Sequence, residues 1–126
     1  MTLACDGGMT VTPGLLVGER EHRLYPLDPH KIDYIESDGN YVSILSGDTA
    51  YISRDTMKRL AAELAQLGFV RIGRSLLVNV RAVAYAQTIG RGRFAFTLCS
   101  GACLHSSATY RDAILQALPL ANRRSN

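Results

Sequence analysis

The sequence predicts a mostly-β domain with one main amphipathic helix and a short C-terminal helix. Three observations lead to this fold class. From residue 22 onward, segments with alternating polar and apolar residues are separated by turns that contain Gly, Asn or Asp. One segment, residues 54–68, changes to the helical period. The length of 126 residues, with 47% apolar and 20% charged residues, is typical of a single globular domain.

Four strands are predicted before the helix, because four segments of strand length alternate polar and apolar residues. Asp38-Gly39-Asn40 and Gly47-Asp48 are turn signals that separate the last three segments. The four segments are residues 22–27, 31–37, 41–46 and 49–53. The residues before them follow no period, so residues 1–22 are expected to form a flexible lead.

Residues 54–68 predict the main helix. Its apolar side chains recur every three or four residues and are expected to face the core instead of a cofactor. These side chains are Met57, Leu60, Ala61, Leu64 and Leu67. Asp55 or Ser53 is expected to cap the start of the helix, and Gly68 is expected to end it.

A hairpin and a three-stranded meander are predicted after the helix. The hairpin turns at Gly73-Arg74-Ser75. The meander consists of residues 80–89, 94–99 and 102–106. A short amphipathic helix is predicted over residues 109–118, with Ser107 as its N-cap. Domain residues 23–118 are then followed by residues 119–126, which are expected to form a polar tail.

Charge is unevenly distributed along the chain. Residues 1–63 hold ten acidic and six basic residues, whereas residues 64–126 hold eight arginines and one acid, Asp112. This pattern favours an anionic partner, nucleic acid first, although a solvated basic surface also explains it. No apolar run approaches the roughly 20 residues that cross a bilayer, and the N-terminus lacks a signal-peptide pattern. A cytoplasmic protein without a membrane partner is expected.

The sequence gives little support for catalysis or metal binding. Its three histidines lie in no nucleophile motif, so no enzymatic activity, no cofactor and no small-molecule substrate are expected. Cys99, Cys103 and His105 are residue types of zinc sites, but a fourth ligand is missing. A two-residue turn at Ser100-Gly101 would place the cysteines on opposite faces. Buried, inert cysteines are the favoured interpretation, and a redox pair is the lesser alternative.

Two arginines interrupt the apolar run FVRIGRSLLVN, residues 69–79. Arginine is expensive to bury unpaired, and no acid lies near Arg71 or Arg74 in the sequence. An arginine at a turn tip suits phosphate oxygens or the O6/N7 edge of guanine. Ion pairs with acids of the first half are the structural alternative: Asp38, Asp48 or Glu63.

The turn Gly90-Arg91-Gly92-Arg93 also has two interpretations. It is a phosphate or minor-groove contact, or it is a hairpin turn whose glycines supply positive φ and whose arginines keep the loop solvated. A phosphate contact requires this turn to lie beside the main DNA-binding surface. The sequence favours neither interpretation.

Three motifs, in this order, resemble the LytTR DNA-binding domain of bacterial response regulators in two-component systems. They are KIDYIESDGNYVSIL (31–45), YISRDTMKRL (51–60) and GFVRIGRSLLVN (68–79), and a weaker SSATYR (106–111) follows them. The resemblance implies small antiparallel β-sheets stacked beside a helix. It also implies loops that enter successive major grooves of tandem promoter repeats, bend the DNA, and are used by two copies of the domain.

The resemblance therefore implies a sequence-specific regulator of transcription that binds double-stranded DNA and is not an enzyme. A β-rich protein-binding module that has lost DNA readout is the alternative. By resemblance, Asn40 contacts an adenine edge, Arg74 reads a base and Ser75 binds a phosphate. Arg54 and Arg71 match positions that hold the DNA backbone, which gives affinity and register instead of sequence choice.

Two positions depart from the family pattern. Gly73 stands where family members usually carry His, and Ala108 and Thr109 follow Ser107 where they usually carry Arg. The third DNA contact is therefore expected to be weaker or to pass to Thr109 or Arg111, with altered sequence preference or lower affinity. About 22 residues precede the domain, which suits a stand-alone regulator without a receiver or a fragment of a longer one.

Overall fold

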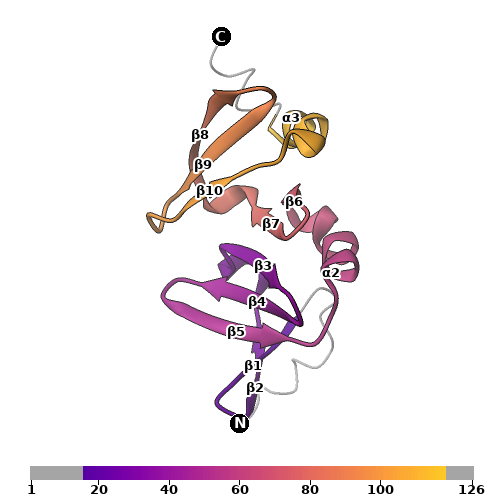
Figure 1. The fold of residues 1–126 in the computed structure, drawn as a ribbon. Coiled ribbons are helices and arrows are strands. Elements are labelled where there is room, and N and C mark those ends of the chain that lie inside the picture. The colour runs from indigo at the N-terminus through magenta and orange to yellow at the C-terminus, as the bar shows by residue number, and fades with distance from the viewer. Residues whose placement is uncertain (1–15, 119–126) are drawn as a thin grey trace.

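A computed structural model of the chain describes residues 16–118 (Figure 1). The described strands form two antiparallel sheets, one of seven strands in the order β2-β1-β5-β4-β3-β7-β6 and one of three in the order β10-β9-β8. The strands are β1 Leu16–Arg20, β2 Arg23–Leu27, β3 Tyr34–Asp38, β4 Tyr41–Ser46, β5 Thr49–Ser53, β6 Phe69–Gly73, β7 Leu76–Asn79, β8 Val83–Gly90, β9 Arg93–Leu98 and β10 Cys103–His105. The predicted mostly-β fold class is confirmed.

Two short α-helices and four 3₁₀ turns complete the described chain. They are α2 Met57–Leu64 and α3 Arg111–Ala117, with η1 Pro29–Lys31, η2 Ala65–Leu67, η3 Val80–Ala82 and η4 Ala108–Tyr110. Neither α-helix has the length or the apolar composition that crossing a bilayer requires, as judged over residues 16–118.

Two hydrophobic cores lie on opposite faces of the β6–β7 hairpin. The first contains α2 and one face of the large sheet, and Phe69 and Leu77 belong to it. The second contains the small sheet and α3, and Val70, Ile72 and Val78 belong to it. Because neighbouring residues of a strand point to opposite faces, this short apolar hairpin joins both cores and is held from two sides. Figure 1 shows this edge of the large sheet between the other strands of that sheet and the small sheet.

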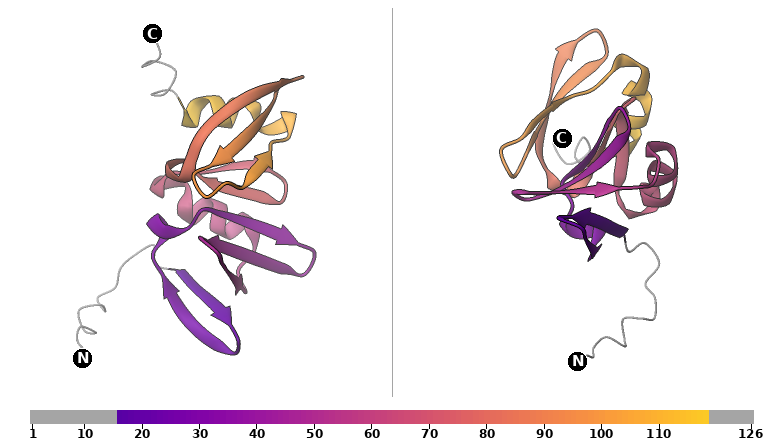
Figure 2. Two further views of the ribbon diagram at one scale, coloured as in Figure 1. Left: turned by 90° about the vertical axis from the view of Figure 1, so that its left-hand side faces the viewer. Right: turned by 60° about the horizontal axis from the view of Figure 1, so that its bottom comes forward.

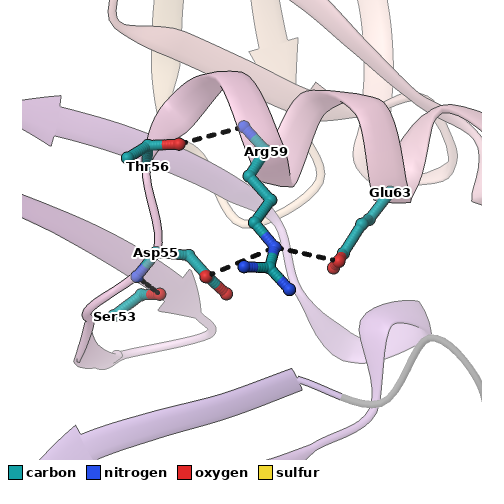
Figure 3. Close-up of polar contacts among 5 residues, drawn as sticks. All are labelled: Ser53, Asp55, Thr56, Arg59 and Glu63. Carbon is teal, nitrogen blue, oxygen red and sulfur yellow. Dashed lines mark hydrogen bonds and ion pairs between the residues drawn. The ribbon is translucent and has the colours of Figure 1, made fainter.

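Helix α2 begins two residues after the predicted cap Asp55. The hydroxyl of Thr56 accepts a hydrogen bond from the Arg59 backbone N–H at 3.1 Å, so Thr56 is the N-cap (Figure 3). The Ser53 hydroxyl instead accepts from the Asp55 N–H at 3.1 Å, within the preceding turn. The prediction of Asp55 or Ser53 as cap is therefore wrong, whereas Gly68 ends the helical segment as predicted, with φ of 93°.

The apolar stripe of the main helix faces the first core as predicted. Met57, Leu60 and Leu64 are buried in that core, and Ala61 and Leu67 pack against it. This packing, more than helix propensity, holds an eight-residue helix that is marginal in isolation.

The prediction of a flexible lead over residues 1–22 is wrong for residues 16–20, which form β1 and pair with β2. The hairpin turns at Glu21 and His22, whose φ angles of 54° and 67° are those of a tight hairpin turn normally made by Asn and Gly. The sequence therefore carries no turn signal at this point. Residues 1–15 of the predicted lead, and the predicted tail 119–126, lie outside the described residues.

The predicted C-terminal helix is shorter than residues 109–118. The Ser107 hydroxyl accepts a hydrogen bond from the Thr109 N–H at 3.3 Å and so caps the 3₁₀ turn η4, which leads into α3. The predicted meander is confirmed as β8, β9 and β10. Its last hairpin pairs Thr97 with Cys103, so its loop contains three residues instead of the two predicted.

Candidate nucleic-acid interface

Two hairpin turns lie side by side at one end of the seven-stranded sheet. Strand β3 pairs antiparallel with β7, and the Ser37 N–H donates to the Ser75 carbonyl at 2.9 Å. The end of β3 that leads to Asn40 is therefore next to the turn that carries Arg74 and Ser75. In the left panel of Figure 2, the tips of the β3–β4, β6–β7 and β8–β9 hairpins point to the same side. We call this side the tip edge: turns 39–40, 74–75 and 91–92 with residues 107–111.

The β3–β4 turn is tight and presents Asn40 to solvent. Asp38 pairs with Tyr41, so only Gly39 and Asn40 connect the strands. Gly39 has φ of 65°, which suits the first central position of a hairpin turn and is costly for other residues. The exposed side chain of Asn40 therefore stands in a two-residue turn directly before β4.

The side chain of Arg71 holds the β6–β7 turn by hydrogen bonds to its backbone. Its Nε donates to the Gly73 carbonyl at 3.3 Å, and its Nη2 donates to the Arg74 carbonyl at 2.7 Å. Its guanidinium carbon lies 5.9 Å from the ring centroid of Tyr110, over the ring face. These contacts satisfy two turn carbonyls and leave the side chain of Arg74 exposed at the tip.

The alternative that Arg71 and Arg74 pair with acids of the first half is wrong for the described residues. No carboxylate of the described residues lies within 4.0 Å of the Arg71 or Arg74 guanidinium. Glu63 instead pairs with Arg59 at 3.3 Å. The positive charge of Arg74 is therefore not neutralised within the described part of the chain.

Arg54 lies at the same end of the sheet, because it follows the residue of β5 that pairs with Val42. Its side chain is 84% exposed, but its Nη2 is 3.0 Å from the Glu19 Oε1 on β1. This ion pair cancels much of the field that Arg54 would otherwise direct at an anion. The structure thus brings Arg54 near the other predicted site residues with its charge already balanced.

Residues 107–111 complete the tip edge. The Ser107 N–H donates to the Ile72 carbonyl at 2.8 Å, which places this segment beside the end of β6. Thr109 and Arg111 are exposed there, as a DNA contact requires. The Nη1 of Arg111 lies 3.3 Å from the Asp112 Oδ1, an ion pair between solvent-exposed side chains.

Gly73 is not required by the backbone of the turn. A Cβ at this position would meet the Leu76 Cβ at 3.7 Å, an ordinary contact distance, and its φ is not left-handed. The fold alone therefore does not explain why this chain has Gly where the family usually carries His.

The structure corrects the interpretation of the cysteines. Cys99 and Cys103 are exposed, not buried, because the three-residue loop puts Cys99 in the turn and Cys103 on the outer edge strand. Within residues 16–118, no three His, Cys, Asp or Glu side chains gather in a way that would hold a metal ion.

Burial raises the pKa of Tyr34, and the carboxylates of Glu36 and Asp33 raise it further, so its hydroxyl stays protonated at neutral pH.

The sequence does not predict the roles of two further residues in this region. Tyr110 supports the Arg71 guanidinium, and Glu19 neutralises Arg54. Helical or strand periodicity signals neither contact, because the partners belong to elements far apart in the sequence. The Tyr in SSATYR is the one local signal that pointed near the first of them.

Comparisons with known proteins agree with this geometry. The chain matches the model of the LytTR DNA-binding domain family over residues 22–119. It is similar to a solved LytTR DNA-binding domain of a methyl-accepting/DNA response regulator from Bacillus cereus, with a TM-score of 0.77 at 16% identity. The similarity covers 82% of this chain and 95% of that chain and confirms the predicted LytTR-like fold. No curated protein matches the chain. The chain belongs to the LytTR family of DNA-binding domains, which are not enzymes.

Proposed function

We propose that this protein regulates transcription by binding double-stranded DNA in a sequence-specific manner through the tip edge. The observation that carries the proposal is the juxtaposition of Asn40 and Arg74 on two adjacent rigid turns. Arg74 keeps its charge and full donor fork for a ligand, because no described carboxylate pairs with it.

In this proposal, Arg74 reads a guanine edge in the major groove and Asn40 pairs with an adenine edge. Ser75 binds a phosphate beside Arg74. Arg71 has a dual role, because a guanidinium has five N–H donors and two of them are used by the turn carbonyls. Its remaining donors contact a phosphate while the other two hold the turn in place.

The outer contacts of the proposal are weaker. Arg54 contacts a phosphate only if the phosphate displaces the Glu19 carboxylate from the Arg54 guanidinium. Thr109 and Arg111 share a third contact beyond the β6–β7 turn. Loops that enter successive major grooves of tandem repeats, two copies of the protein and bent DNA complete the proposal, together with a cytoplasmic location.

The experiment is selection of bound sequences from a pool of random duplexes, with the winners titrated across salt concentrations. An enriched, repeated motif with a steep salt dependence supports the proposal and provides the operator. Binding without enrichment contradicts sequence-specific regulation and leaves a basic surface that binds any duplex.

A protein-binding module is the second candidate function. It is favoured by Val17 and Leu24, which are 55% and 69% exposed on the β1–β2 hairpin. Exposed apolar side chains that lie together are typical of protein-binding surfaces. Absence of binding to any duplex at low salt would favour this candidate over DNA binding.

A further inference from the structure

We infer that the β8–β9 turn is a further contact with the DNA backbone, in which Arg91 and Arg93 bind phosphates of the duplex held by Arg74. The inference rests on the proposed function and extends it to a turn whose role the sequence leaves open. Three observations support it: the backbone conformation of Arg91, the absence of neutralising acids, and the position of the turn at the tip edge.

Arg91 occupies a backbone conformation that its residue type rarely adopts. Gly90 pairs with Arg93, so Arg91 and Gly92 are the central residues of a two-residue turn, with φ of 57° and 77°. Both values are positive, and Asn, Asp or Gly is preferred at the first of these positions. The turn geometry therefore does not account for an arginine at this position, which leaves its side chain open to another role.

The two arginines of this turn carry charge that the described part of the protein does not balance. Arg91 and Arg93 are exposed, and none of the described carboxylates forms an ion pair with them. Between Glu63 and the C-terminus the only acid in the sequence is Asp112, which pairs with Arg111 at 3.3 Å. Two unbalanced guanidinium groups two residues apart attract a polyanion.

The turn is fixed against the segment of the third expected contact. A Cβ at Gly92 would lie 3.1 Å from the Arg111 Cδ and 3.7 Å from the Ala108 Cβ, so the turn packs directly on these residues. The Phe94 N–H donates to the Ser106 hydroxyl at 2.9 Å, and the Ser106 N–H donates to the Phe94 carbonyl at 2.9 Å. The next residue, Ser107, bonds the end of β6.

This position compensates for a departure from the family pattern. Family members usually carry Arg after the serine of this segment, whereas this chain carries Ala108 and Thr109. The small side chain of Ala108 leaves room for the β8–β9 turn, and the turn brings two arginines to the place where one is missing. Positive charge at the third contact is thus supplied from another element.

The contact is with phosphates and not with bases. Base reading requires a well-positioned turn, and Arg71 hydrogen-bonds the backbone of the Arg74 turn. Among the described residues, no side chain hydrogen-bonds the backbone of residues 90–92 in this way. The structure has no hydrogen bond from the Arg91 or Arg93 side chain to another described residue. Exposed arginines whose side chains no neighbouring residue orients suit phosphate contacts, which give affinity without sequence choice.

The test compares a variant with both turn charges removed, Arg91→Asn with Arg93→Gln, with the parent. The probes are a 30-base-pair duplex of random sequence and the operator found by selection. Asn suits the left-handed conformation at position 91, so thermal stability is expected to be kept. We expect the slope of log Kobs against log salt to become shallower by about two units on both duplexes, because two phosphate contacts are lost.

Arg81→Gln is the matched control. Arg81 is also exposed, but it lies on η3, which follows β7 at the end of the sheet opposite the tip edge. Its loss is expected to leave the slope unchanged, and a second variant, Arg91→Lys with Arg93→Lys, is expected to restore the parent's slope. If Arg91→Asn with Arg93→Gln has the same slope of log Kobs against log salt as the parent, the inference is overturned, whatever the variant's stability.

The outcomes separate this inference from the proposed function. If the parent enriches an operator but the double variant keeps its slope, the inference is wrong and the proposed function stands. If the parent enriches no sequence but the double variant still loses slope, the turn binds DNA and sequence-specific regulation is wrong. A parent that binds no duplex at low salt overturns both.

Discussion

Arginines in two regions of this protein have opposite surroundings. In the region that ends with α2, Arg54 pairs with Glu19, and Arg59 lies 3.8 Å from Asp55 and 3.3 Å from Glu63 (Figure 3). From β6 to β9, the described carboxylates lie beyond 4.0 Å of every arginine. Arg54 and Arg59 of the first region and Arg74, Arg91 and Arg93 of the second are all exposed, and they differ in whether an acid lies next to them.

Under the proposed function, pairing with acids as well as the number of arginines decides how strongly a surface attracts DNA. An exposed ion pair contributes little to stability, with a median of about 0–1 kcal/mol, but it removes a charge from the field that a polyanion experiences. At the tip-edge end of the sheet, Glu19 neutralises Arg54, so the β6–β7 and β8–β9 turns carry the unbalanced positive charge there.

The largest expected effect is that of Arg74→Ala on specific binding. Loss of a guanidinium that reads a base costs about 1–3 kcal/mol, roughly fivefold to 160-fold in affinity, and blurs preference at one base position. Fluorescence anisotropy with the selected operator and its single-base variants measures both. Thermal stability is expected to be unchanged, because the side chain is exposed and makes no described hydrogen bond.

Arg81→Ala provides the comparison for that variant, since it removes an equally exposed arginine from the opposite end of the sheet. If Arg74→Ala and Arg81→Ala bind the operator and its variants equally well, Arg74 is not the base-reading residue.

Arg71→Ala is expected to have a smaller effect on specific binding, together with a loss of stability. The Gly73 and Arg74 carbonyls lose their partner, so the free energy of unfolding falls by about 1 kcal/mol. The salt slope falls by about one unit on all duplexes, because one phosphate contact is lost. Chemical denaturation and salt titrations measure the two effects separately.

Arg71→Lys separates bracing of the turn from contact with phosphate. Lysine keeps the charge but cannot hold two carbonyls with a planar fork. We expect the variant to recover the parent's salt slope but to have a blurred preference at the Arg74 base position, because the turn is no longer braced by two hydrogen bonds. Full recovery of base preference would show that Arg71 acts on the DNA alone.

The parts of the fold that the sequence predicts are those encoded by local patterns. Glycine turns and alternating residues identify the hairpins around Asn40 and Asp48, and the apolar stripe from Met57 identifies the main helix. The β1–β2 hairpin was missed because Glu21 and His22 adopt the conformation of a glycine turn without its residue types. The helix cap was misplaced because Thr56, Asp55 and Ser53 all qualify by type, and only the backbone path selects one.

The interface is predicted only as a set of residues. The resemblance names Asn40 and Arg74, but their adjacency depends on the pairing of β3 with β7, two strands that α2 and β4 to β6 separate in the sequence. Neutralisation of Arg54 depends on β1, the strand that the sequence analysis missed. The burial of the cysteines was predicted wrongly because a turn one residue longer changes where each side chain lies.

The smallest expected effect comes from Glu19→Gln. This change gives Arg54 of the first region what the arginines of the second region have, a positive charge without a neighbouring acid. The change frees Arg54 from its partner at 3.0 Å and costs less than about 1 kcal/mol of stability, since the Arg54 side chain is 84% exposed. With its charge unbalanced at the tip edge, Arg54 is expected to gain a phosphate contact and to steepen the salt slope by up to about one unit. The double variant Glu19→Gln with Arg54→Gln is expected to lose that gain. If Glu19→Gln alone leaves the slope at the parent's value, Arg54 lies beyond reach of the DNA. Its pairing with Glu19 is then not the reason that it makes no phosphate contact.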